Sequence, residues 1–231
     1  MVKYYKIAGL TVKMDSFGRT AEQAEPYCCD PCDAPEIIIE SDWPLKKQFY
    51  PDWTDDLGEY IATGWDFYKK LLHFDGLMLH SSAVVVDGKA YLFTADSGTG
   101  KSTHTGLWLK KFPGAYILND DKPALRLEQD GWYAYGTPWS GKNDISAAER
   151  VPVAGIAVLE RAEKNTIEPF GGIGAVREIL KQVNRPRDTR YREMLLELMD
   201  KLITQVPVWK LHCNMDPEAA EVSYGAMSGG K

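Results

Sequence analysis

The stretch that decides the fold is Tyr91–Asp121, which reads YLFTADSGTGKSTHTGLWLKKFPGAYILNDD. An apolar run at Tyr91–Phe93 leads into a loop with two glycines, Ala95–Ser102, and a helix-like segment continues to Phe112. The pattern predicts the order strand, loop, helix that a phosphate-binding loop requires. In such a loop the glycines let successive backbone N–H groups converge on one phosphate, and the helix N-terminus adds its positive end.

Two side chains of this loop have predicted roles toward a nucleotide. Lys101 supplies a positive charge to the phosphates, and Ser102 offers a hydroxyl to Mg²⁺. Ala95 stands where the usual pattern has its first glycine. The alternative is a glycine turn that binds nothing. We expect ATP to be bound by the loop residues Ser97, Gly98, Thr99, Gly100, Lys101, Ser102 and Thr103.

A pair of carboxylates follows the next predicted strand. Asp120 and Asp121 end the segment AYILNDD, the place where an aspartate holds Mg²⁺ near Ser102 in phosphate-binding proteins. The alternative is an ordinary solvated turn. Successive residues of a strand face opposite ways, so we expect one carboxylate to lie nearer the metal and the other nearer the phosphate acceptor.

The composition is typical of a soluble globular protein: 231 residues, 44% hydrophobic and 26% charged, with a formal net charge of −6. The acidic balance argues against a general nucleic-acid binder, because that function needs clustered lysine and arginine. No run approaches the roughly 18 apolar residues of a membrane helix, and the N-terminus lacks the apolar core of a signal peptide. We therefore expect a cytoplasmic protein that binds neither nucleic acid nor membranes.

The apolar spacing predicts a mixed α/β fold. Before the loop we expect a strand or hairpin over 1–15, a loop over 16–35, a strand over 36–40, an irregular connection over 43–57, a helix over 58–74 and a strand over 77–86. Asp87-Gly88 is a strong hairpin signal, so the strand entering the loop should pair antiparallel with the strand before it. After the loop helix we expect strands over 115–120, 123–127, 132–135, 151–159 and 206–211, and helices over 172–184, 188–204 and 217–224.

Three further groups of residues have two interpretations each. Cys29 and Cys32, with Cys28 beside them, have a spacing that can bind a metal, or they are reduced loop thiols. The loop Trp139–Lys142 either folds over the phosphates, with Lys142 compensating charge, or is an ordinary exposed loop. Aromatic residues in the irregular connection either form a substrate groove or pin that segment to the core: Trp43, Tyr50 and Trp53.

Residues 79–105, LHSSAVVVDGKAYLFTADSGTGKSTHT, together with the NDD that follows, resemble the catalytic core of HPr kinase/phosphorylase. They are similar to the wider group that shares the nucleotide fold of ATP-dependent phosphoenolpyruvate carboxykinase. The resemblance covers about residues 59–160, and the tail VPVWKLHCNMDPEAAE looks like the end of compact relatives. The separate N-terminal domain and the helical element with which HPr kinases grip their protein substrate have no match here.

The resemblance implies a mixed β-sheet kinase core over 59–231, with a β-rich extension over 1–58 packed on it. Functional positions of the family fall on His80, Lys101, Ser102, Asp120 and Asp121. His80 would contact the transferring phosphoryl group. Asp120 would be the general base for the acceptor hydroxyl, and Asp121 would join Ser102 on the Mg²⁺ side. The other histidines, His73, His104 and His212, are interpreted as structural or surface residues.

We therefore expect a Mg²⁺- and ATP-dependent kinase whose acceptor is a hydroxyl, foremost a serine of a peptide or small protein. A kinase of a small hydroxylated metabolite and a nucleotide-binding sensor without turnover are the alternatives. The choice between ATP and GTP, the reverse phosphorolysis reaction and assembly into a homo-oligomer stay open at this stage.

Overall fold

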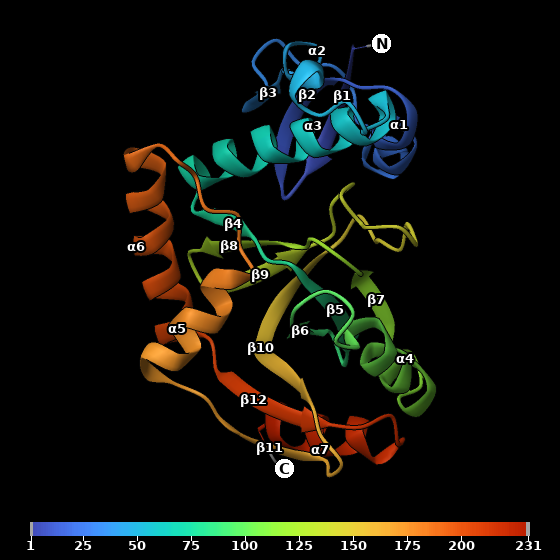
Figure 1. Cartoon of the computed structure of the whole chain (residues 1–231), viewed down its shortest axis with the longest axis vertical. Helices are drawn as coiled ribbons and strands as arrows, with labels where there is room; N and C mark the ends of the chain where they lie inside the picture. The colour runs from blue at the N-terminus through green and yellow to red at the C-terminus, as the bar shows by residue number, and fades with distance from the viewer. Residues whose placement is uncertain (1, 230–231) are drawn as a thin grey trace.

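The computed structural model describes residues 2–229 and has a mixed α/β fold built around a curled mixed sheet (Figure 1). Seven strands follow the order β4-β8-β9-β10-β6-β5-β7, and β12 and β11 extend the sheet beside β10. The strands are β4 (Gly76–Met78), β5 (Ser81–Val86), β6 (Lys89–Thr94), β7 (Tyr116–Asn119), β8 (Ala124–Glu128), β9 (Gly131–Tyr135), β10 (Arg150–Arg161), β11 (Thr166–Pro169) and β12 (Val208–Cys213).

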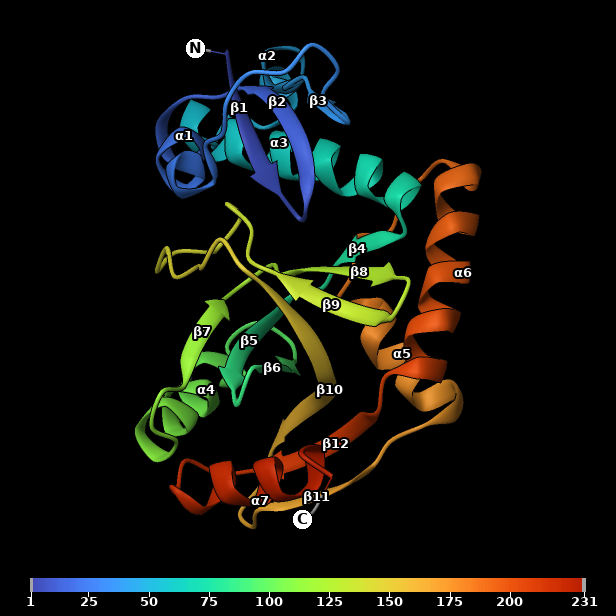
Figure 2. The same cartoon turned by 180° about the vertical axis from the view of Figure 1, so that it is seen from behind.

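The long strand β10 joins the two halves of this sheet. Its first residues pair antiparallel with β9, and its later residues pair parallel with β6 on one side and β12 on the other. Figure 2 shows β10 running from β8 and β9 down to β12 at the opposite end of the molecule. Because β10 is shared, the strand that enters the glycine loop is held in the interior of the sheet.

The β5–β6 hairpin turns at Asp87-Gly88, as the sequence predicted, and both residues have positive φ. The strand predicted over 77–86 is wrong in one respect, because it is split. β4 pairs with β8, β5 pairs with β6 and β7, and the chain changes partners at His80. Both pieces are buried on both faces, so the apolar run alone gave no sign of the break.

The N-terminal residues form a separate three-stranded sheet, β1 (Val2–Ile7), β2 (Leu10–Asp15) and β3 (Ile37–Ile39), beside the helix α3 (Asp55–Leu71). The loop predicted over 16–35 is wrong in part, since α1 (Gly18–Ala24) and the 3₁₀ turn η1 (Glu25–Tyr27) lie there. The inner face of α1 is built from Thr20, Gln23 and Ala24, so it shows no apolar period. The predicted irregular connection contains α2 (Trp43–Lys46) and the 3₁₀ turn η2 (Lys47–Phe49).

The remaining helices are η3 (Leu72–Phe74), α4 (Lys101–Lys111), α5 (Gly172–Lys181), α6 (Thr189–Gln205) and α7 (Glu218–Met227). Among them, α5 and α6 pack against one face of the large sheet and α4 and α7 against the other. One buried apolar cluster extends from the N-terminal sheet through α3 to α6, and a second lies between the sheet and the pair α4 and α7. The boundary predicted at 58/59 falls inside α3, and the division into two units stays a prediction. Within residues 2–229 no helix combines the length and the apolarity that crossing a bilayer requires.

Candidate phosphate-binding site

The loop between β6 and α4 turns sharply at two glycines. Gly98 has φ +77° and Gly100 has φ +124°, values that residues with a side chain rarely adopt. The N–H of Thr99 donates to the Asp96 carbonyl at 3.2 Å, and α4 begins directly afterwards at Lys101. The positive end of α4 therefore faces the space above the loop, where an anion is favoured.

Lys101 lies folded over this loop. Its Nζ donates to the Ala95 carbonyl at 2.9 Å, and the residue is only 8% exposed. Burial lowers the pKa of Lys101, while Asp121 raises it and Lys122 lowers it. Because the amine is partly removed from water, its attraction to an entering phosphate is stronger than that of a solvated lysine.

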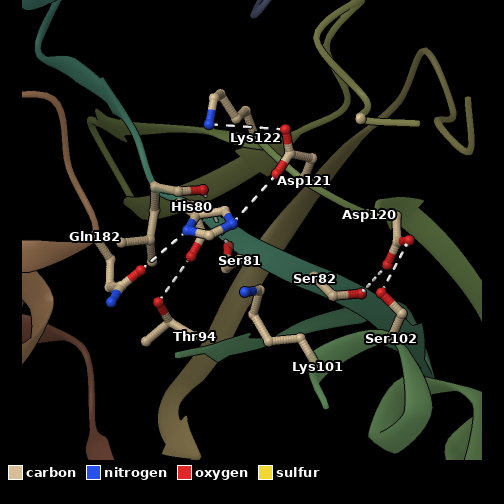
Figure 3. A network of polar contacts seen from close by, with 12 residues as sticks. His80, Ser81, Ser82, Thr94, Lys101, Ser102, Asp120, Asp121, Lys122 and Gln182 are labelled. Carbon is tan, nitrogen blue, oxygen red and sulfur yellow. Dashed lines mark hydrogen bonds and ion pairs between the residues drawn. The ribbon is translucent and has the colours of Figure 1, made fainter. Parts of the chain in front are cut away.

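Asp120 forms the first of two polar groups beside Lys101 (Figure 3). Ser102 Oγ donates to Oδ2 of Asp120 at 3.1 Å, and Ser82 Oγ donates to Oδ1 at 2.7 Å. Asn143 Nδ2 also donates to Oδ2, at 3.2 Å. A serine hydroxyl and a carboxylate held together are hard oxygen ligands of the kind that Mg²⁺ prefers. The arrangement fits a Mg²⁺ ion held by one or two protein oxygens and by phosphate.

His80 and Asp121 form the second polar group, on the other side of Lys101 (Figure 3). Nε2 of His80 lies 3.3 Å from Oδ1 of Asp121. Burial lowers the pKa of His80, and the charges of Lys101 and Lys122 lower it further, while Asp121 raises it. The net direction is downward, so the imidazole is neutral at pH 7.

Gln182 determines which nitrogen of His80 carries the proton. Its Nε2 donates to the Asp96 carboxylate at 2.9 Å, and its Oε1 therefore faces Nδ1 of His80 at 3.0 Å. Since that oxygen only accepts, the ring proton lies on Nδ1 and Nε2 presents a lone pair to Asp121. Two acceptors 3.3 Å apart leave room for one proton between them. This pair can take up a proton from a hydroxyl.

The two aspartates lie on a turn rather than on the strand. β7 ends at Asn119, whose buried Oδ1 accepts the N–H of Asp121 at 3.0 Å and that of the next residue at 2.7 Å. The chain bends there, and the two carboxylates reach different partners. The sequence predicted Asp121 beside Ser102 on the Mg²⁺ side; in the structure the Ser102 hydroxyl contacts Asp120, and Asp121 contacts His80.

The loop between β9 and β10 closes the cavity opposite Lys101. Trp139 is buried, and its ring stacks on Phe67 of α3 with 4.9 Å between centroids. Lys142 is exposed and lines the cavity. The segment is therefore anchored to the N-terminal part of the molecule rather than lying free, and it carries Lys142 to the phosphate side.

Gly141 is the point where the N-terminal helices hold this loop. Its carbonyl accepts hydrogen bonds from Arg19 and from Gln23 Nε2, the latter at 3.2 Å. Its N–H donates to the Tyr60 hydroxyl at 3.2 Å. In Figures 1 and 2 the loop after β9 reaches toward α1 and α3.

These elements enclose one cavity of about 460 Å³. All the predicted site residues line it except Thr99, which lies on the other side of the loop. The predicted residues brought together are His80, Ser97, Gly98, Gly100, Lys101, Ser102, Thr103, Asp120, Asp121 and Lys142.

Sequence reasoning missed several partners of these residues. Ser82 had a usable signal, because it is two residues after His80 and strand neighbours at that spacing share a face. Gln182 had none, since it is 102 residues away from His80 along the chain. Asn143 likewise reaches Asp120 only through the path of the β9–β10 loop.

The other features that the sequence singled out lie outside this cavity. Cys28, Cys29 and Cys32 are free thiols, and among residues 2–229 no group of three or more His, Cys, Asp or Glu side chains is placed to hold a metal ion. Trp53 stacks between Trp43 and Tyr50 at 6.1 and 4.5 Å, beside a hollow of about 510 Å³. A larger polar hollow of about 1260 Å³ lies between the N-terminal hairpin and the β8–β9 hairpin, away from the glycine loop.

Comparison with known proteins gives a family match. The family model described as "SynChlorMet cassette protein ScmC" matches residues 59–220. A search of curated proteins finds no match. Among solved structures, "Structure of the Hpr(Ser) kinase/phosphatase from Coxiella burnetii" is similar at 15% sequence identity with a TM-score of 0.38, covering 64% of this chain and 95% of that chain.

Proposed function

This chain belongs to the SynChlorMet cassette protein ScmC family, and we propose that it is a Mg²⁺- and ATP-dependent kinase that transfers the γ-phosphoryl group to a hydroxyl. The observation that carries the proposal is the arrangement around Lys101. A pair suited to a metal, Ser102 with Asp120, lies on one side, and a pair suited to a proton, His80 with Asp121, lies on the other. A phosphoryl-transfer site needs these two functions on either side of the phosphate.

The loop and Lys101 would bind the β- and γ-phosphates through backbone N–H groups and the ammonium charge. Ser102 and Asp120 would hold Mg²⁺, which neutralises charge on the phosphates when it is bound. Lys142, on the β9–β10 loop, would add a positive charge from the opposite wall. The contribution of these residues is to position the reactants and to stabilise charge.

The proton of the acceptor hydroxyl would pass to Asp121. The acceptor oxygen then forms a bond to the γ-phosphorus as the bond from that phosphorus to the ADP oxygen breaks. His80 would then share this proton with Asp121 through Nε2. These roles reverse the ones that the sequence resemblance implied for Asp120 and Asp121, because the side chains contact opposite partners.

A serine of a peptide or small protein is the acceptor we propose. The support is the sequence resemblance of residues 59–160 to HPr kinase/phosphorylase. The alternative acceptor is a small hydroxylated metabolite. One transfer assay separates the two acceptor classes.

The test is transfer from γ-labelled ATP to a panel of serine-containing peptides and hydroxylated metabolites, with Lys101→Met as the matched inactive variant. We expect label on a peptide serine with the wild-type chain and none with Lys101→Met. Label on a metabolite alone would show that the acceptor is a small hydroxylated metabolite and not a peptide serine. ATP binding without transfer to any acceptor or to water would indicate a sensor, and equal transfer by Lys101→Met would overturn the site.

A further inference from the structure

A second hollow, which we call the outer hollow, lies on the other side of the glycine loop. Its volume is about 380 Å³, and it shares Gly100 and Thr103 with the phosphate cavity. A molecule that occupied both would cross the N-terminus of α4 at Thr103. The volume falls within the range of about 300–1,000 Å³ that is usual for small-molecule sites.

The walls of the outer hollow are mainly apolar. Leu159 near the end of β10 and Cys213 at the end of β12 are each 5% exposed. Ala162 follows β10, and Met215, which is 76% exposed, borders the mouth. Apolar side chains of this kind suit a flat heteroaromatic ring, and an exposed methionine can adapt its contacts to one.

His104 supplies the outer hollow with a buried polar group. The residue is 2% exposed, and burial lowers its pKa to about 4, so the ring is neutral at pH 7. Its Nε2 lies 3.1 Å from the Ser223 hydroxyl and 3.2 Å from the indole nitrogen of Trp108, which also donates to Ser223 Oγ at 3.0 Å.

The other ring nitrogen of His104, Nδ1, is buried and finds no hydrogen-bond partner among residues 2–229. Leaving a buried polar atom unpaired is unfavourable. The residue borders the outer hollow, so a ligand there that offered a hydrogen-bonding group to Nδ1 would pair it.

Arg161 connects the outer hollow to the glycine loop. Its Nε donates to the Thr99 carbonyl at 2.8 Å, and its Nη2 donates to the Gly98 carbonyl. The guanidinium therefore braces the loop from the outer side and adds a positive charge beside the hollow. If a ligand placed a neutral ring in the outer hollow and an anionic group near Lys101, the anionic group would lie close to the Arg161 guanidinium.

We propose that the outer hollow binds the base and ribose of the nucleotide whose phosphates occupy the cavity above Lys101. The proposal rests on the proposed function and adds to it a site for the nucleoside, with His104 Nδ1 as a hydrogen-bonding partner of the base or ribose. It gives His104 a role beyond the structural one that the sequence suggested.

The experiment compares the binding of ATP and of inorganic tripolyphosphate, in the presence of Mg²⁺, by isothermal titration calorimetry. Both ligands can use the glycine loop, and only ATP has a nucleoside. We expect ATP to bind at least tenfold more tightly than tripolyphosphate to the wild-type chain. Lys101→Met should weaken the binding of both ligands.

His104→Phe keeps an aromatic ring but removes both ring nitrogens, and Trp108 Nε1 retains Ser223 Oγ as an acceptor at 3.0 Å. We expect His104→Phe to weaken ATP binding by about two- to tenfold and to leave tripolyphosphate binding unchanged, since the variant loses one hydrogen bond to the nucleoside. Met215→Ser should weaken ATP binding several-fold. The position is exposed, so the substitution puts folding at little risk. Ile173→Ser, at a similarly exposed position away from both cavities, is the control and should change neither affinity.

Equal affinities of ATP and tripolyphosphate for the wild-type chain would overturn the nucleoside site and leave the phosphate site standing. The same conclusion would follow if Met215→Ser weakened both ligands to the same degree. Failure of both ligands to bind would overturn the proposed function together with the nucleoside site.

Discussion

Gly141 packs directly against Asp121: a methyl group added at the Gly141 Cα would lie 2.8 Å from the Asp121 Cβ. The residue has φ +79°, and its carbonyl is held by Arg19 and Gln23 of α1. The N-terminal helix and the proposed base are therefore in contact through a single glycine. A side chain at position 141 therefore cannot be accommodated unless Asp121 moves.

Replacing Gly141 with alanine should reduce phosphotransfer by tenfold or more, because the new methyl group must displace Asp121. The matched control is Gly114→Ala, since Gly114 has nearly the same φ of +80° and nothing among the described residues comes within 4 Å of an added methyl group. Both changes should destabilise the fold by about 1–2 kcal/mol through left-handed backbone strain. Transfer assays and denaturant unfolding would measure the two effects separately. Equal rate losses in both variants would contradict the proposed contact.

The two aspartates should differ in their dependence on Mg²⁺. Asp120→Asn removes charge beside Ser102, so the Mg²⁺ concentration for half-maximal rate should rise. Asp121→Asn should lower the rate at saturating Mg²⁺ by about 10²–10⁴-fold, the usual contribution of a general base, and leave the Mg²⁺ requirement near its wild-type value. Rate measurements across a Mg²⁺ series test both. The opposite pattern would restore the roles that the sequence resemblance implied.

His80→Ala should lower turnover by about 10²-fold and change ATP affinity by less than about twofold, because the ring shares the transferred proton with Asp121 and does not contact the base or ribose. His73→Ala, at an exposed position, is the control. Since burial and the two lysines lower the pKa of His80, its titration should not raise the rate between pH 7 and pH 8. A rate that increased across this interval in the wild-type chain but not in His80→Gln would show a histidine that titrates near neutrality.

The folded chain should lose stability as the pH rises, because the buried carboxyl of Glu59 must ionise. The carboxyl is buried beside Thr20, and burial raises its pKa from 4.5 to about 7. Between these values the folded chain keeps a proton that the unfolded chain has released, so stability is highest below pH 4.5 and is lost through pH 7. The full effect is at most roughly 3–4 kcal/mol, at 1.36 kcal/mol for each pH unit between 4.5 and 7.

Glu59→Gln should therefore flatten the change in unfolding free energy between pH 5 and pH 8, because the amide resembles the protonated acid. Glu218→Gln, at an exposed position of α7, should keep the wild-type profile. Denaturant unfolding at the two pH values is the measurement. An unchanged slope in Glu59→Gln would show that this carboxyl is ionised in the folded chain.

Local patterns in the sequence predicted most of the elements. The hairpin at Asp87-Gly88 was correct because that turn depends on two adjacent residues that tolerate positive φ. The helices α3, α5 and α6 were correct because their apolar spacing follows one period. The helix α1 was missed because its buried face includes Thr20 and Gln23, whose burial depends on Glu59 and Gly141 elsewhere in the chain.

The glycine loop and the presence of two carboxylates after the next strand were determined by the sequence itself, since each is a short run of residue types. Only the tertiary structure decided which carboxylate meets Ser102, because the turn made by Asn119 after β7 places Asp120 and Asp121 against different neighbours. The orientation of the His80 ring likewise depends on Gln182, which the fold brings from a distant helix end. Local propensities specify how a segment folds, whereas partners far apart in the chain are set by how the segments pack.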